Sequence, residues 1–266
     1  MTKFARSALA ATALVLTSTA GAFAADLNGG SIKDSGYMPP MAQRASGLYL
    51  RGDFSAGWTD FGSMTEPPAY TLSDARIGNS RYWGGGIGYY FSPNVRGDLT
   101  LDGSNTASAR GTVHDGVATV QGERQFGVKH LVGLANLYYD FDMRSRFTPY
   151  LGVGLGFARN TTTAGSINII GCDTGPTGAP NCAANFDGAA KTNAAGALMA
   201  GFSAKLGDRW SLDAGYRFLY LGDAHTGDIM ITRAAPVVGA PASTPDPVIH
   251  DMYDHQFRVG LRMDVH

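Results

Sequence analysis

Arginine and aspartate side chains recur in this sequence at alternate positions, flanked by apolar or aromatic neighbours. A guanidinium presents N–H donors in a planar fork, and a carboxylate accepts two of them side by side. Such pairing is what makes buried charge tolerable. Ten residues follow the pattern and predict a network of interior salt bridges: Arg51, Asp53, Arg96, Asp98, Asp102, Asp140, Asp213, Arg217, Arg258 and Arg262.

Gly152, Gly154 and Gly156 invite comparison with a dinucleotide-binding loop. The G-x-G-x-x-G fingerprint fails, because position 159 is Arg and no helix follows. A smooth face beneath larger neighbouring side chains explains the glycines better, so no nucleotide cofactor is predicted.

The segment 147–158 shows that β-strands position the charged residues and the glycines. Its odd positions are Phe, Pro, Leu, Val, Leu and Phe, and its even positions are Thr, Tyr, three Gly and Ala. Successive side chains of a strand point to opposite faces, so one face is apolar and the other small or polar. The same alternation predicts eight strands, at residues 48–58, 82–91, 95–102, 131–141, 147–158, 194–206, 210–221 and 252–265.

The connections between these segments alternate in length. Turns of three to five residues follow the second, fourth and sixth segments, whereas more than twenty residues follow the first, third, fifth and seventh. Short turns on one side and long loops on the other are typical of outer-membrane barrels. The sequence therefore predicts an all-β fold, an eight-stranded antiparallel transmembrane β-barrel (up-and-down meander), with periplasmic termini and four long extracellular loops.

The position of the charged face distinguishes a membrane barrel from a soluble one. A soluble barrel has an apolar interior and a charged exterior, and here we expect no second apolar layer in the loops to cover the apolar face. The apolar face should therefore meet lipid, and the charged face should line the interior. An eight-stranded barrel has room only for its own side chains, which predicts a salt-bridged plug rather than an open pore.

The N-terminal region predicts export. Lys3 and Arg6 precede a short run of apolar and small residues, and Ala22-Phe23-Ala24 matches a cleavage site. Cleavage between Ala24 and Ala25 would divide the chain into a signal peptide at 1–24, a flexible periplasmic tail at 25–46 and the outer-membrane barrel at 47–266. The mild net charge near −3 that then remains does not favour nucleic acid as a partner.

Cys172 and Cys182 are the two cysteines of the chain. In an exported protein a disulfide between them is the default expectation. In the chain-entropy model, closing a loop of this size stabilises the fold by about 2–3 kcal/mol. No histidine neighbours them, so a zinc site is not predicted.

Three segments of the predicted strands carry a family resemblance: Asn136–Phe141 (NLYYDF), Thr148–Gly156 (TPYLGVGLG) and Asp213–Phe218 (DAGYRF). They resemble the small alphaproteobacterial outer-membrane β-barrel family of porin-like surface antigens, and more remotely the OmpA/OmpX-type barrels. The resemblance covers residues 22–265 and implies the outer membrane of a Gram-negative cell. The implied partners are outer-membrane lipid, lipopolysaccharide and the β-barrel assembly machinery, with host or surface ligands at the loops.

The last strand departs from the family pattern. The assembly machinery reads an ending of the form polar-x-Gly-x-x-aromatic-x-aromatic. Arg258 and Gly260 match it, but Met263 and Val265 take the aromatic positions and His266 follows. We expect the apolar residues of this strand still to share one face. We also expect the efficiency of insertion into the membrane to depend on the missing aromatic residues.

Acidic residues and histidines also gather around the last long loop. Their oxygen and imidazole groups could hold a divalent ion near lipopolysaccharide. Solvated loop and rim residues are the simpler interpretation, and we predict neither a metal nor another cofactor. The residues concerned are Asp223, His225, Asp228, His250, Asp251, Asp254 and His255.

A catalytic role would require a nucleophile beside a base. Lipid A deacylases place a serine, a histidine and an acid on the outer face near the membrane. The alternation places His255 on the outward face of its strand, but it places Ser211 on the inward face near the periplasmic end. The two side chains are therefore not expected to meet. We therefore expect that the protein is not an enzyme.

These observations predict a structural outer-membrane protein, acting as a monomer, that supports envelope integrity and presents its loops as a surface antigen or adhesin. The Pro- and Ala-rich stretch 236–247 would be an exposed tip of the fourth loop. The first alternative is a narrow ion or small-solute channel. A lipid-modifying enzyme and a soluble periplasmic binding protein are further alternatives.

Overall fold

The structure is a computed structural model that describes residues 47–65, 70–115, 121–141, 143, 145–170, 181–232, 242–244 and 247–265. The predicted signal peptide, the cleavage site at Ala24 and Ala25, and the tail at 25–46 lie outside the described residues. Within those ranges, no helix is long and apolar enough to cross a membrane.

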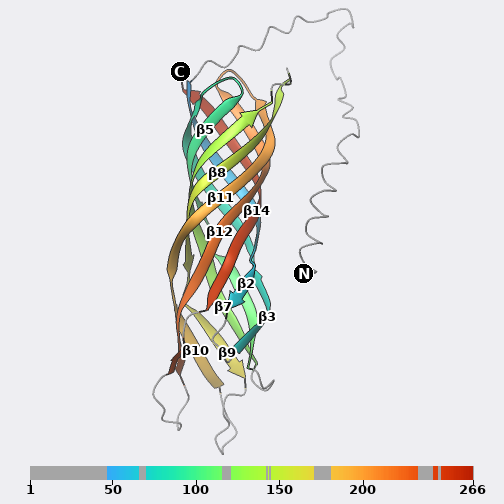
Figure 1. Cartoon of the computed structure of the whole chain (residues 1–266). Helices are drawn as coiled ribbons and strands as arrows, with labels where there is room; N and C mark the ends of the chain where they lie inside the picture. The colour runs from blue at the N-terminus through green and yellow to red at the C-terminus, as the bar shows by residue number, and fades with distance from the viewer. Residues whose placement is uncertain are drawn as a thin grey trace, which may run out of the picture. The chain divides into compact units, whose positions relative to one another are not determined.

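Eight long strands of the described chain close into an antiparallel ring (Figure 1). Each pairs with the next along the chain, and the last returns to pair with the first, so that Leu48 lies opposite Val265. Closure leaves the ring without an edge strand, as hydrocarbon requires. The predicted eight-stranded β-barrel is confirmed. Its strands are β1 (Gly47–Asp60), β4 (Asn79–Tyr90), β5 (Val95–Ser104), β7 (Gln121–Asp140), β8 (Phe147–Thr162), β11 (Ala190–Lys205), β12 (Trp210–Thr232) and β14 (Val248–Val265).

The short turns gather at one end of the ring, where the sequence itself stabilises them. The Ser92 hydroxyl oxygen accepts hydrogen bonds from the amides of Asn94 and Val95, closing the turn between β4 and β5. Asn94 then donates through its side chain to the carbonyl of Asp140, at the end of β7. Local Ser and Asn side-chain bonds of this kind favour turns over continued strands.

The long connections form strands, which corrects the expectation of four long loops. In the described ranges they contain β2 (Ser63–Thr65), β3 (Tyr70–Ile77), β6 (Ala107–Asp115), β9 (Gly165–Ile170), β10 (Asn181–Gly188) and β13 (Ala242–Thr244). β7 begins ten residues before its predicted start and pairs there with β6 and β9. β12 continues to Thr232 and pairs with β10 and β13. The barrel wall is thereby prolonged into an extension beyond the ring.

The interior of this extension is largely apolar, although it also buries Arg124, whose guanidinium lies 5.7 Å from the centre of the Phe186 ring. Val113, Phe126, Ile167, Phe186 and Ile249 are each no more than 6% exposed, and the rings of Phe126 and Phe186 meet edge to face at 5.8 Å. The connections therefore do contain an apolar layer, contrary to the sequence-based expectation. It fills the extension from within and leaves the outward face of the ring uncovered.

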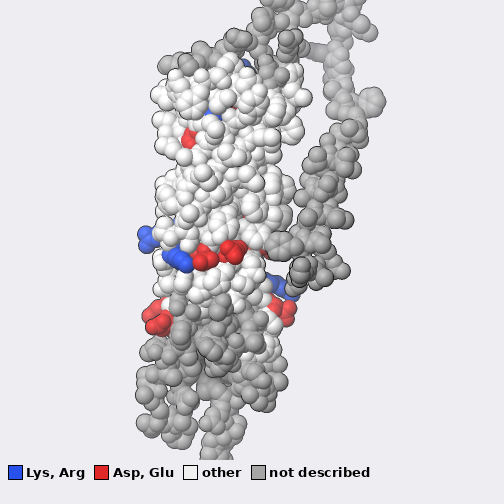
Figure 2. All heavy atoms as spheres, viewed as in Figure 1, with Lys and Arg blue, Asp and Glu red and all other residues white. Residues whose placement is uncertain are grey.

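The outward face of the ring is a band of exposed apolar side chains. On β8, Leu151, Val153 and Leu155 are 54%, 52% and 74% exposed. Figure 2 shows a broad surface with almost no charged atoms, bordered by a belt of acidic and basic side chains. Aromatic residues such as Trp83 and Trp210 lie toward the two ends of the band, as in the girdles of membrane barrels. The band is the surface that faces lipid.

We predict that Val153→Arg destabilises the folded barrel by about 2–4 kcal/mol, because it places a charge in mid-membrane on the lipid face. Leu206→Arg is the control, since Leu206 is 61% exposed beside a periplasmic turn. It should cost less than about 1 kcal/mol. Urea unfolding in lipid vesicles measures both, and equal losses would contradict the assignment of the band to lipid.

Candidate functional site

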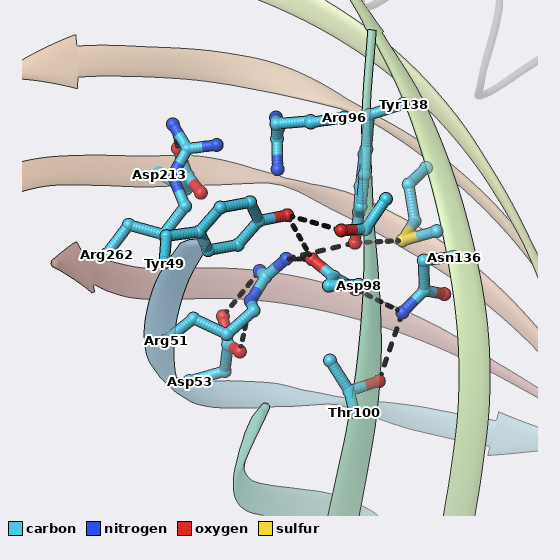
Figure 3. A network of polar contacts seen from close by, with 12 residues as sticks. Tyr49, Arg51, Asp53, Arg96, Asp98, Thr100, Asn136, Tyr138, Asp213 and Arg262 are labelled. Atoms are coloured by element: carbon cyan, nitrogen blue, oxygen red, sulfur yellow. Dashed lines mark hydrogen bonds and ion pairs between the residues drawn. The ribbon is translucent and has the colours of Figure 1, made fainter. Parts of the chain in front are cut away.

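A chain of ion pairs occupies the lumen at the level of the lipid-facing band (Figure 3). Arg51 on β1 donates to Asp53 at 2.8 Å and to Asp98 on β5 at 2.6 Å. Arg258 on β14 reaches the other oxygen of Asp53 at 2.7 Å. Asp53 is thus held by guanidinium groups from two strands, whereas Asp98 is bonded by that of Arg51.

One pair spans the width of the barrel. Arg217 on β12 donates to Asp102 on β5 at 2.5 Å, and four steps of the eight-strand ring separate these strands in either direction. Arg217 also donates through Nε to the side-chain oxygen of Gln256 at 2.8 Å. Arg258 approaches Asp102 at 3.9 Å, which links this pair to the chain through Asp53. The lumen is therefore crossed by bonded side chains.

Two further pairs lie nearer the end of the ring that carries the short turns. Arg96 bonds to Asp140 at 3.0 Å, and Arg262 lies 3.2 Å from Asp213. The guanidinium of Arg96 also lies over the ring of Tyr138, 4.0 Å from its centre. Such cation–π contacts add to charge pairing where water is excluded.

All ten residues proposed from the sequence for the interior network lie inside the barrel. None is more than 8% exposed, and each takes part in at least one ion pair. Several partners were missing from the predicted set: Tyr49, Asn136, Tyr138, Asp254 and Gln256. Tyr49 donates to Asp98 at 2.9 Å, and Asn136 donates to the same carboxylate at 2.8 Å. The alternation of apolar and polar residues along each strand already indicated that these side chains point inward.

Inward glycines give the network its space. A Cβ at Gly260 would lie 2.1 Å from the Asp53 carboxylate, and one at Gly154 would lie 2.3 Å from the Asn136 carboxamide oxygen. A Cβ at Gly152 would meet the Tyr138 ring at 2.5 Å. Two of the glycines that were compared with a nucleotide loop, Gly152 and Gly154, therefore lie beneath large side chains from a neighbouring strand, whereas a Cβ at Gly156 would meet the backbone of Gly133.

A polar layer separates the charged lumen from the apolar extension. Tyr82 donates to Asp254 at 2.6 Å, and its ring lies against His130 with centres 6.1 Å apart. His130 Nδ1 is 2.8 Å from the side-chain oxygen of Asn160, which in turn donates to the carbonyls of Leu221 and Asp223. These contacts close the outer end of the lumen.

The candidate metal ligands are dispersed. Asp254 points into the lumen, whereas His255 faces outward, stacked on Trp58 at 5.2 Å and bonded to the Tyr216 hydroxyl. Asp223 lies at the outer rim, 3.6 Å from His250. Among the described residues, no group of three or more His, Cys, Asp or Glu could hold a metal ion.

Asp223 joins β12 to β11 at the rim. Lys191 donates to it at 3.0 Å, and the amide of Asp251 donates to its other oxygen at 3.2 Å. The hydrogen bond from the Lys191 ammonium holds the pKa of Asp223 below its ordinary value. Asp251 itself has a positive φ of 53° and accepts a hydrogen bond from Tyr220 at 2.8 Å.

Ser211 and His255 do not form a catalytic pair. Ser211 lies opposite Arg262 and is buried inside the barrel, whereas His255 lies opposite Phe218 and faces outward. Cys172 lies outside the described residues, so its disulfide with Cys182 stays a prediction. His266, the last residue of the departing C-terminal pattern, also lies outside them.

Comparison with known proteins agrees with this geometry. The model of the family called outer membrane protein beta-barrel domain matches residues 10–235. The chain belongs to this family. The resemblance to small outer-membrane barrels is thereby confirmed, and membership implies an outer-membrane location.

The chain is also similar to uncharacterized proteins of Brucella. It is 30% identical over 283 residues to one from Brucella abortus, covering 94% of this chain and 95% of that protein. Among solved structures, OprG from Pseudomonas aeruginosa gives a TM-score of 0.45 at 16% identity, covering 83% of this chain and 97% of that one. Neisserial surface protein A gives 0.42 at 16% identity, covering 84% and 100%.

We predict that Gly260→Ala destabilises the barrel by about 1–3 kcal/mol, because the added Cβ overpacks the lumen against Asp53. Gly52→Ala is the matched control, since a Cβ there would have no atom within 4 Å. Guanidinium unfolding in detergent should show a lower midpoint for the first variant alone. Equal midpoints would mean that the network does not depend on close packing.

The Lys191–Asp223 pair should contribute less than about 1 kcal/mol, because both side chains are partly exposed. The lowered pKa of Asp223 means that the contribution is complete above the ordinary carboxyl pKa and is lost as pH falls through the lowered value. Asp223→Asn should therefore reduce the unfolding free energy at pH 7 and have no effect in strong acid. An effect that persists in acid would contradict the role of the charge.

Proposed function

We propose that this protein is a structural, non-conducting outer-membrane barrel that presents a strand-built extension outside the cell. The observation that carries the proposal is the Arg217–Asp102 pair across the full width of the lumen. A hydrated ion entering the lumen would have to separate these charges. Each would then be left buried without its partner, which costs about 3–5 kcal/mol.

The extension supports the same conclusion. Phe126, Phe186 and Ile249 fill its interior directly outside the polar layer around Tyr82. An ion that passed the salt bridges would meet a closely packed, largely apolar core, where an unpaired charge is strongly disfavoured and where the buried cation of Arg124 lies against Phe186. Two independent barriers therefore lie in series along the barrel axis.

The extension is also the part of the barrel that partners could reach. Its wall is built from β3, β6, β9 and β10 together with the outer ends of β7 and β12. Surface segments carried by a rigid scaffold are common sites of recognition. This arrangement supports a role as a surface antigen or adhesin, and the completed ring supports a monomer. Lipid, lipopolysaccharide and the assembly machinery remain the proposed envelope partners.

We predict that the purified full chain gives no steady conductance in planar lipid bilayers. Its folded state is first verified by heat-modifiable mobility on gels. Reproducible single-channel steps would contradict the proposal and support the narrow channel instead. In that case Arg217→Gln would change the steps if they pass the lumen, whereas Lys191→Gln, at the rim, would leave them unchanged.

A further inference from the structure

Three exposed cations lie close together on the outer rim of the ring. They are Arg81 on β4, Lys129 on β7 and Arg159 on β8, and only β5 intervenes in this run of consecutive strands. Among the described residues, no ion pair involves any of them. We call these three residues the cationic sector. They contrast with the lumen arginines, all of which are paired.

Neighbouring aromatic residues indicate how deep in the membrane the cationic sector lies. Arg81 and Arg159 each lie two residues beyond an exposed aromatic residue, Trp83 and Phe157 respectively, on the same outward face. Two residues of a strand advance by about 7 Å. The cations therefore stand directly outside the apolar band, at the level where the headgroups of the outer leaflet begin.

The register brings the cations within reach of one ligand. Lys129 lies opposite Thr161, and Arg159 lies opposite Leu131, so Lys129 and Arg159 are diagonal neighbours on one face. Diagonal positions in an antiparallel pair are about 7–8 Å apart. Arg81 is hydrogen-bonded through its backbone to Asn105, which follows the end of β5 beside β7.

The opposite side of the rim is acidic. Asp60, Asp223 and Asp251 lie on β1, β12 and β14, and the nearby Lys191 is already bonded to Asp223. Asp251 is bonded by Tyr220. These acidic side chains therefore lie on strands other than those of the cationic sector, and within the described ranges of the chain the cationic sector has no ion-pair partner.

A second feature of the same side also favours an anion. Arg76 on β3 lies directly opposite Arg110 on β6, and both are exposed. Like charges at directly opposed positions destabilise a sheet. They line a shallow groove of about 730 Å³ that also contains Asp74 and Glu123, which offset part of the repulsion. This pair extends the basic surface outward, but the cationic sector carries the argument.

We propose that the cationic sector binds the phosphate groups of lipopolysaccharide in the outer leaflet. Guanidinium groups match phosphate oxygens with paired hydrogen bonds, and an ammonium adds a point charge. The sector spans three strand spacings, about 14 Å, which suits a glycolipid with two phosphates better than a single phospholipid headgroup. The proposal rests on the membrane placement in the proposed function, and it does not require a closed lumen.

The test compares two triple variants of the folded full chain. Arg81→Gln, Lys129→Gln and Arg159→Gln remove the cationic sector. Arg146→Gln, Lys205→Gln and Arg209→Gln remove the same charge from exposed positions at the periplasmic end. Heat-modifiable mobility confirms that both variants fold. Binding of fluorescent bisphosphorylated lipid A to the detergent-solubilised protein is then measured by anisotropy.

We expect the first variant to bind lipid A about tenfold more weakly than the unchanged protein, since three exposed ion pairs each contribute modestly. The control variant should bind like the unchanged protein, and dephosphorylated lipid A should compete poorly. Equal binding by the two variants would overturn the proposal. Competition by phosphatidylglycerol as strong as that by lipid A would overturn the choice of lipopolysaccharide. Bilayer conductance is a separate readout, so failure of the closed-lumen proposal is distinguishable.

Discussion

A guanidinium enclosed in a narrow membrane barrel must be paired, and this constraint governs the rest of the interior. Removing one partner of a buried pair leaves an uncompensated charge, which costs several kcal/mol. The five lumen arginines meet the constraint through carboxylates on neighbouring and opposite strands. The links join β1, β5, β12 and β14 across the lumen, so the same bonds that neutralise charge also brace the ring and underlie the proposed exclusion of ions.

The other inward residues follow from this requirement. Asn136 donates to the Asp98 oxygen that arginine does not reach, and Tyr49 donates to the oxygen that Arg51 also bonds. Tyr138 supplies an aromatic face for Arg96. Gly154 and Gly260 occur where a side chain would displace a network member. The high glycine content, 36 residues in all, therefore serves the polar interior in part, since a narrow barrel can admit large side chains only beside small ones.

Charge is used differently in three zones of the barrel. In the lumen it is paired and buried, in the extension it gives way to a largely apolar core, and at the rim it is more exposed, with an ion pair between Lys191 and Asp223 and three cations on β4, β7 and β8. The lipid-facing band between the rim and the periplasmic turns is apolar because any unpaired charge there would face hydrocarbon. The paired lumen underlies the proposed closed barrel, and the cationic sector of the rim underlies the proposed lipid contact.

The sequence by itself determined the closed antiparallel barrel, its two faces and ten of the charged residues of its interior, because the alternation along each strand is a local property. It did not reveal that the connections form strands around Phe126 and Phe186, since these short segments bury apolar residues only when β6, β9 and β10 assemble beside β7 and β12. Only the tertiary structure decided which charges pair. Arg217 meets Asp102 from 115 residues away on the opposite wall. Strand order, tilt and stagger together set the depth and direction of each side chain, and none of these is a property of a single strand.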